Sequence, residues 1–160
     1  MKIPSNTDVY IDSNALISYF VPHHRQHRSS VVMFAKLLVK GNILNLSPLV
    51  LDETFHGIRE EYNALRKTMN QPAKPHSFFY DELKRVVDYT LNFSGVKIRQ
   101  FEKSLEDGCR VAVDNIKKFS LAPKDAFSVA YMIDWGIQYI VSNDSNFDTL
   151  KSVSIFRLSY

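Results

Sequence analysis

The sequence contains little that marks a secreted, membrane-spanning or nucleotide-binding protein. It has one cysteine, Cys109, in 160 residues. It therefore forms no internal disulfide, and a lone thiol fits a reducing compartment. No apolar run approaches the ~18 residues of a membrane span, and residues 1–8 hold no apolar signal core. The phosphate-binding motifs G-x-x-x-x-G-K-[ST] and G-x-G-x-x-G are also absent. We therefore expect a cytoplasmic protein without a membrane partner.

The composition is that of an ordinary globular protein, with 45% hydrophobic and 23% charged residues. A chain of 160 residues is long enough for one domain with a substantial core. It contains no internal repeat, low-complexity tract or linker, so residues 1–160 are predicted to form a single domain. The formal net charge of +3 permits a nucleic-acid partner but is poor evidence for one.

Short apolar runs alternate with segments of helical periodicity along the chain. Strands are predicted at Val9–Ile11, Ile43–Leu46, Gly95–Ile98, Tyr139–Ser142 and Val153–Leu158. Helices are predicted at Asn14–Phe20, His27–Lys40, Pro48–Met69, Ser77–Phe93, Phe101–Phe119 and Pro123–Trp135. Continuous apolar strands separated by helices indicate a parallel sheet covered on both faces. The sequence therefore predicts a three-layer α/β domain.

Four acidic residues stand at the ends of predicted strands or the starts of predicted helices. Asp12 and Asp144 follow strands, while Glu53 and Asp125 lie in the opening turns of helices. In an open parallel sheet, ligands bind beyond the carboxyl ends of the strands, and helix starts face the same edge. We therefore expect the four carboxylates to converge, although 41, 72 and 19 residues separate them along the chain.

Converging carboxylates repel one another, by about 4 kcal/mol for a pair ~4 Å apart at an effective dielectric of ~20. A divalent cation relieves this repulsion. Mg²⁺ and Mn²⁺ favour carboxylate oxygens and water. Such ions activate a water molecule and orient a phosphate for in-line displacement. An acidic cluster of this kind is therefore predicted to be a site for phosphodiester hydrolysis.

Each acid also has a purely structural interpretation. Asp12 could cap the helix that follows it, and Asp125 could stabilise its own helix through the dipole. Asp144 could belong to a turn. Glu53 and its neighbour Asp52 cannot both point toward the site. Helical spacing alone does not show which of the two does.

Other reactive side chains are expected to have ordinary roles. A zinc site needs four ligands, usually including cysteine, so the histidines of the segment 23–27 are expected to lie in a solvated loop. Cys109 lies in the middle of a predicted helix and is expected to be buried. Four aromatic side chains could stack on bases if exposed, although core packing is the expectation for each: Tyr62, Phe78, Phe79 and Tyr80.

The segments around the four acids together resemble the PIN domain, the nuclease fold of toxin–antitoxin toxins and of several RNA-processing enzymes. The similar motifs are Val9–Ile17, Leu46–Glu53, Pro123–Ala130 and Val141–Asp148. They occur in the family's order and span nearly the full chain. The resemblance favours Glu53 over Asp52, and it implies a three-layer α/β/α fold with a parallel sheet of about five strands. Residues 63–93 form a longer segment than in the small toxins.

The resemblance implies a divalent-metal-dependent endoribonuclease that uses Mg²⁺ or Mn²⁺ on RNA, and a toxin silenced by an antitoxin protein is one role that it suggests. It also makes a homodimer the expected assembly. The implied catalytic and metal-binding residues are Asp12, Glu53, Asp125 and Asp144, with Asp148 as an additional metal ligand and Asn14, Ser142 and Asn143 as supporting polar groups. The alternative is a non-catalytic PIN-like module that binds RNA or protein. A phosphatase with a nucleophilic aspartate is disfavoured, because Asn14 stands where the Asp-x-Asp motif needs its second aspartate.

Overall fold

Five parallel strands form the sheet in the computed structural model, which describes residues 3–160. They are β1 (Asp8–Ile11), β2 (Ile43–Leu46), β3 (Val96–Ile98), β4 (Tyr139–Val141) and β5 (Phe156–Leu158). Their order across the sheet is β3-β2-β1-β4-β5, and every neighbouring pair is parallel. The predicted α/β class and the five-stranded parallel sheet are confirmed.

The central strand β1 positions the edge of the sheet where ligands are expected. Tyr10 pairs with Asn45 of β2 on one side, and Ile11 pairs with Val141 of β4 on the other. The order of the strands therefore reverses between β1 and β4, and the crevice for a ligand lies beyond their carboxyl ends. Asp12 directly follows β1 at this point.

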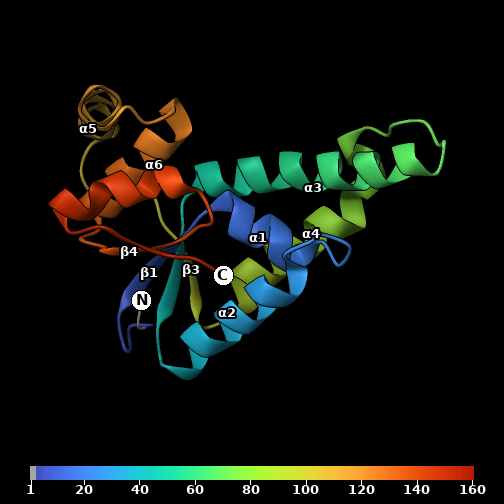
Figure 1. Ribbon diagram of the computed structural model, residues 1–160, viewed down its shortest axis with the longest axis horizontal. Coiled ribbons are helices and arrows are strands. Elements are labelled where there is room, and N and C mark those ends of the chain that lie inside the picture. The colour runs from blue at the N-terminus through green and yellow to red at the C-terminus, as the bar shows by residue number, and fades with distance from the viewer. Residues whose placement is uncertain (1–2) are drawn as a thin grey trace.

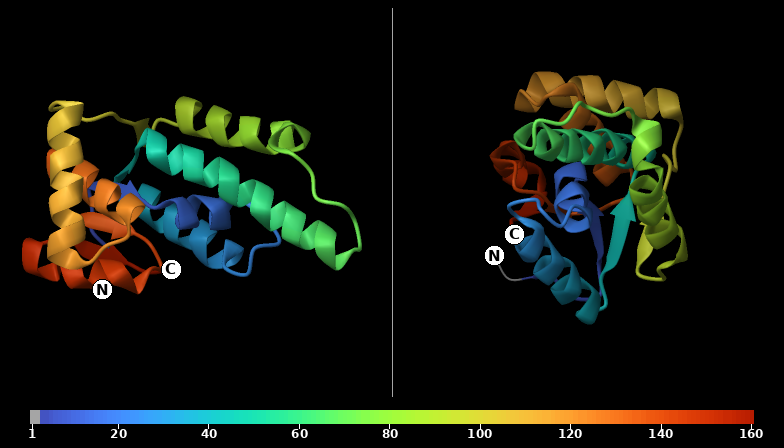
Figure 2. Two further views of the ribbon diagram at one scale, coloured as in Figure 1. Left: turned by 90° about the horizontal axis from the view of Figure 1, so that it is seen from above. Right: turned by 90° about the vertical axis from the view of Figure 1, so that its right-hand side faces the viewer.

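Helices cover both faces of the sheet. They are α1 (Ser13–Phe20), α2 (His27–Val39), α3 (Pro48–Thr68), α4 (Tyr80–Asn92), α5 (Leu105–Phe119) and α6 (Pro123–Asp134), with 3₁₀ helices η1 (His76–Phe79) and η2 (Ser145–Val153). Figure 1 shows α5 and α6 on one side of the strands and α1 and α2 on the other, as a three-layer fold requires. The far end of α3 projects beyond the sheet, together with the loop into α4 (Figures 1 and 2). No helix in residues 3–160 has the length and apolar character needed to span a membrane.

Local sequence signals fix the ends of several helices. The Ser47 hydroxyl accepts a hydrogen bond from the N–H of Val50 (3.3 Å), and Pro48 occupies the first turn of α3, where a missing N–H costs nothing. Gly41 and Gly136 follow α2 and α6 with φ of +71° and +67°. Only glycine adopts that left-handed conformation at little cost, and both helices end within one residue of their predicted ends.

Three predicted boundaries are wrong. The helix predicted to begin at Ser77 starts instead as the 3₁₀ turn η1, and α4 begins at Tyr80 without a serine cap. The helix predicted from Phe101 begins only at Leu105, because Ser104 accepts the N–H of Asp107 (3.1 Å) and caps it there. The strand predicted from Val153 begins only at Phe156, because η2 occupies residues 145–153 and buries its own apolar side chains against the core.

A buried polar link ties β1 to the N-cap of α3 and to the middle of α6. The Tyr10 hydroxyl lies 2.9 Å from the hydroxyl oxygen of Ser47 and donates to Ser128 across 3.3 Å. Burial raises the pKa of Tyr10, so its hydroxyl stays protonated at any ordinary pH. This link holds the N-terminal end of α3 and the middle of α6 against β1.

Candidate active site

Asp12 is a buried carboxylate at the carboxyl end of β1, with only 6% of its surface exposed. Its N–H donates to the carbonyl of Val141 (3.1 Å), so β4 fixes its position. Ser142 Oγ donates to Oδ2 at 2.7 Å, and Ser13 Oγ and Asn14 Nδ2 reach the carboxylate at 3.4 and 3.5 Å. The carboxylate makes no capping hydrogen bond with the backbone of α1. The structure therefore does not support the capping interpretation for this side chain.

The electrostatic surroundings of Asp12 disfavour its charge. The pKa of Asp12 is raised from 3.8 to about 6, chiefly by burial, with the negative charges of Asp125 and Glu53 contributing to the rise. The hydrogen bond from Ser142 opposes this rise. At neutral pH the carboxylate is still mostly ionised, so the folded protein holds a buried charge beside other negative charges.

Asp125 lies in the first turn of α6, where Pro123 starts the helix. The pKa of Asp125 is raised, first by burial and then by the negative charges of Asp144 and Glu53. Lys124 opposes the rise. Since Asp125 also acts on Asp12, all four predicted carboxylates lie within electrostatic reach of another member of the set.

Glu53 and Asp52 have different surroundings. The Glu53 side chain is 15% exposed, and its buried Oε1 has no hydrogen-bond partner among the described residues. Lys124 Nζ lies 3.4 Å away, close enough for an ion pair but not aligned for a hydrogen bond. The Asp52 side chain is 71% exposed and lies 4.0 Å from His56. The structure therefore turns Glu53 toward the acids. Lys124 is a site residue that the sequence reasoning missed, and its place next to Asp125 was the available signal.

Asp144 follows β4 and makes two hydrogen bonds that fix the start of η2. Its Oδ1 accepts the N–H of Asn146 (2.8 Å) and caps η2, so the turn interpretation is correct for that oxygen. Its own N–H donates to Ser142 Oγ (3.0 Å), and the same hydroxyl holds Asp12. Asn143 exchanges two hydrogen bonds with the backbone of Tyr160, at 3.1 and 3.0 Å. Ser142 therefore links two acids, while Asn143 secures the end of the chain.

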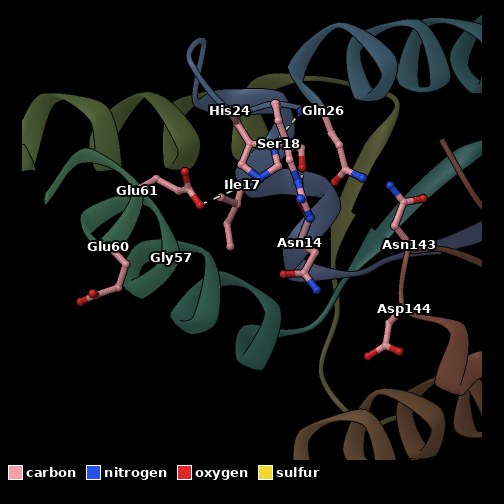
Figure 3. Close-up of a pocket in the computed structure, with 11 residues that line it drawn as sticks. Asn14, Ile17, Ser18, His24, Gln26, Gly57, Glu60, Glu61, Asn143 and Asp144 are labelled. Atoms are coloured by element: carbon pink, nitrogen blue, oxygen red, sulfur yellow. Dashed lines mark hydrogen bonds and ion pairs between the residues drawn. The ribbon is translucent and has the colours of Figure 1, made fainter. Parts of the chain in front are cut away.

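Two adjoining clefts of about 510 and 650 Å³ lie along α1 and α3. Glu53 and Lys124 line the larger cleft, and Asp144 lines the smaller one. Both are lined by Asn14, Ile17, Gly57 and Glu60. In Figure 3, Asn143 and Asp144 face the smaller cleft from the side opposite Gly57, Glu60 and Glu61.

Asp12, Asp125 and Asp148 line neither cleft, and of these three only Asp148 is held in ion pairs away from the other acids. Its Oδ2 accepts a 2.6 Å hydrogen bond from Arg157 Nη2, and Lys151 Nζ lies 3.7 Å from Oδ1. The Arg157 guanidinium lowers the pKa of this exposed carboxyl group. Asp148 thus serves an ion pair between η2 and β5 here, and the prediction that it is a metal ligand gains no support from the geometry.

His23 is exposed as expected, but the expectations for His24, His27 and the cysteine are wrong in detail. His27 Nδ1 lies 3.0 Å from the carbonyl of Ser18, and His24 accepts the N–H of Gln26 at 3.1 Å, so both rings are part of the fold and only partly exposed. Cys109 is only partly buried, because α5 turns Gly108 and its other small residues inward. The sequence pattern did not show which side of α5 faces the core.

The donor chemistry of the site fits a hard divalent cation. Carboxylate, hydroxyl and amide oxygens surround it, and a buried Glu53 oxygen lacks a hydrogen-bond partner. As they stand, however, no three His, Cys, Asp or Glu side chains within residues 3–160 are spaced to share one ion. The side chains therefore fit a divalent metal by their chemistry, although their present spacing is not that of a formed metal site.

Comparisons with known proteins agree with this fold. A family model described as the PIN domain matches residues 9–152. Similar solved structures are VapC20 of Mycobacterium tuberculosis, described as a sarcin–ricin loop cleaving toxin (16% identity, 92% of this chain and 96% of that chain, TM-score 0.62), and VapBC2 of Rickettsia felis bound to a promoter DNA fragment (14%, 95% and 98%, 0.57). FitAcB of Neisseria gonorrhoeae is also similar (11%, 94% and 96%, 0.53). The comparison with curated proteins finds no match. At these identities the structural likeness shows the fold alone.

Proposed function

The chain belongs to the PIN-domain family, and from that premise we propose that it is a divalent-metal-dependent endoribonuclease that hydrolyses RNA phosphodiester bonds at its acidic site. The observation that carries the proposal is the buried Asp12, whose pKa is raised to about 6 with Asp125 and Glu53 as contributing charges. A buried carboxylate beside other carboxylates is costly unless a cation compensates it. We infer that the protein keeps this costly arrangement of carboxylates because catalysis needs it.

The residues proposed to hold Mg²⁺ or Mn²⁺ are Asp12, Glu53, Asp125 and Asp144. When bound, such an ion activates a water molecule and stabilises the phosphate under attack. The remaining work belongs to the polypeptide. Ser142 donates to Asp12 and accepts from the N–H of Asp144, so one hydroxyl orients two acids. Asn14 reaches Asp12 from α1 and also lines both clefts, where it can contact substrate.

The entrance to the site carries positive elements that suit a phosphate. Lys124 lies beside Glu53 and lines the larger cleft. The N-terminus of α6, at Pro123, also lines this cleft and adds its helix dipole. These groups would draw the RNA backbone toward the acids, which by themselves repel it.

We further propose a toxin role, with an antitoxin protein as partner. The similar VapC20 is described as a toxin, which supports this role here. The protein is also proposed to be a homodimer. A dimeric mass by light scattering at about 50 µM would support that assembly, and a monomeric mass would count against it.

The test of the nuclease is a cleavage assay on RNA and single-stranded DNA with Mn²⁺, Mg²⁺ or EDTA. RNA should be cut with either metal and left intact in EDTA. Asp12→Asn, Asp125→Asn and Asp144→Asn should each remove most cleavage, and the losses should not add, because the residues act through shared ions. Glu53→Gln and Asp52→Asn form a matched pair of neighbours, of which only the first should lose activity.

Two controls protect the interpretation. Cys109 lies outside the site, so the Cys109→Ser variant should cleave RNA at the wild-type rate. Wild-type cleavage by the double variant Asp12→Asn/Asp144→Asn would reveal a contaminating nuclease. Folded wild-type protein that cuts no nucleic acid with Mn²⁺ would favour the non-catalytic module that binds RNA or protein.

A further inference from the structure

Residues 62–80, here called the arm, hold the whole net charge of the protein. The arm includes the end of α3, the proline-containing loop, and η1, and it lies between Glu61 and Asp81. Three of the chain's 20 Lys and Arg residues lie in it, and none of the 17 Asp and Glu residues does. The rest of the chain therefore carries 17 charges of each sign, and the net charge of +3 belongs to the arm.

The arm also exposes aromatic surface. Phe78 is 55% exposed and Tyr80 is 63% exposed. The Arg66 guanidinium carbon lies 5.3 Å from the centre of the Phe78 ring, and Lys74 Nζ lies 5.0 Å from it. Phe78 touches the ring of Phe79 edge-on, with centroids 5.2 Å apart, but is not part of the buried core. An exposed ring with two cations near it, and no acid in the segment, suits a planar ligand that carries negative charge.

A structural path joins the arm to the acidic site. Glu53 and Arg66 lie on the same helix, 13 residues or ~20 Å apart at 1.5 Å per residue. His56 lines the larger cleft with Glu53, and its ring meets the ring of His76 edge-on, with centroids 4.8 Å apart. His76 begins η1, two residues before Phe78. Figure 1 shows α3 running without a break from the sheet edge to the projecting arm.

We propose that the arm is a stacking platform for single-stranded RNA, with Phe78 stacking on a base and Arg66 and Lys74 contacting phosphates. The proposal deepens the nuclease function and rests on it for the choice of RNA. A strand whose scissile phosphate lies at the acids runs along α3 and reaches Phe78 several nucleotides away. Binding of this kind combines aromatic stacking with a basic surface and depends strongly on salt.

The test measures binding by the full-length protein of a fluorescein-labelled 12-nucleotide RNA of mixed A and U, by anisotropy in EDTA. Phe78→Ala should weaken binding about 5- to 150-fold, the effect of losing one base–aromatic stack. Phe78→Tyr should bind like wild type, because it keeps the ring. Phe78→Leu keeps apolar bulk without the ring and should bind like Phe78→Ala. Leu91→Ala, an exposed position of α4 outside the arm, is the matched control and should bind like wild type.

The cations have a separate readout. Arg66→Gln and Lys74→Gln should each reduce the slope of log affinity against log salt by about 0.7, the value for one lost phosphate contact on a single strand. The experiment needs no cleavage, so the two proposals can fail separately. Wild type that binds through Phe78 and never cuts RNA would end the nuclease proposal alone. Unchanged binding by Phe78→Ala or by Phe78→Leu, or an unchanged slope in both charge variants, would overturn the platform.

Discussion

Replacing Asp12 with asparagine removes the charge at the centre of the acidic site and should stabilise the metal-free protein. The pKa of Asp12 rises from 3.8 to about 6, mainly through burial. A rise of ~2 units corresponds to about 3 kcal/mol, by which the ionised carboxylate lowers the free energy of unfolding at neutral pH. The group is almost completely buried, so solvent screening reduces this figure little.

The direction in which pH changes the free energy of unfolding follows from proton binding by Asp12. Because the folded state holds this proton more tightly than the unfolded state, the stability it contributes is complete below pH 3.8 and is lost as the pH rises through 6. Asp12→Asn escapes that loss but alters the hydrogen bond from Ser142, which costs about 0.5–1.5 kcal/mol. The variant should therefore be about 1.5–2.5 kcal/mol more stable at pH 7.5, which corresponds to ~3–10 °C in Tm.

The measurement is urea unfolding in EDTA at pH 7.5 and near pH 4. The gain of Asp12→Asn should be present at the higher pH and should nearly vanish at the lower one. Asp148→Asn is the opposite control. Arg157 lowers the pKa of Asp148, so the ionised Asp148 carboxylate stabilises the folded protein above its unfolded pKa, and this stabilisation is lost as the pH falls. Asp148→Asn should therefore gain no stability at pH 7.5. Lower stability of Asp12→Asn at pH 7.5 would refute the reasoning and make Asp12 a structural group.

Three further predictions address the metal, the pH profile and the helix contact. Mn²⁺ at 100 times its Kd should raise the stability of wild type by ~2.7 kcal/mol, seen as a thermal shift that Asp12→Asn lacks; an equal shift in the variant would contradict the assigned ligand. Ser142→Ala removes a hydrogen bond that lowers the pKa of Asp12, so the acid limb of the cleavage rate should move to higher pH, and an unmoved limb would count against this coupling. Gly57→Ala would place a Cβ 2.1 Å from Ile17 Cδ1. The cost of overpacking, ~1–3 kcal/mol, should exceed the gain in helix propensity of ~1 kcal/mol, so the urea midpoint should fall. A raised midpoint would show that the Ile17 side chain moves aside at little cost.

The sheet and the convergence of acids could be predicted because their signals are local. Each strand is a short apolar run, and Asp12, Glu53, Asp125 and Asp144 stand at strand ends or helix starts, which a parallel sheet gathers on one edge. The structure brings these acids into electrostatic reach, and their catalytic role stays a prediction.

The errors come from contacts that no local pattern contains. The pairing of Asp148 with Arg157 depends on how η2 lies against β5, and the partial exposure of Cys109 depends on which side of α5 meets the core. The strand predicted from Val153 begins only at Phe156 because the 3₁₀ helix η2 continues through Val153. The helical form of η2 follows from packing against the completed core.

The pairing of β1 with β4 also determines when a newly synthesised chain can complete its sheet. Val141 joins Ile11 across 130 residues of sequence, and Asp144 is synthesised 132 residues after Asp12. At ~5–20 residues per second, a ribosome needs roughly 7–26 s to cover that interval. Until then one edge of the most buried strand has no neighbour and needs protection from aggregation. The unfinished polypeptide also lacks part of its acidic set, so the proposed metal site cannot form before Asp144 has been made.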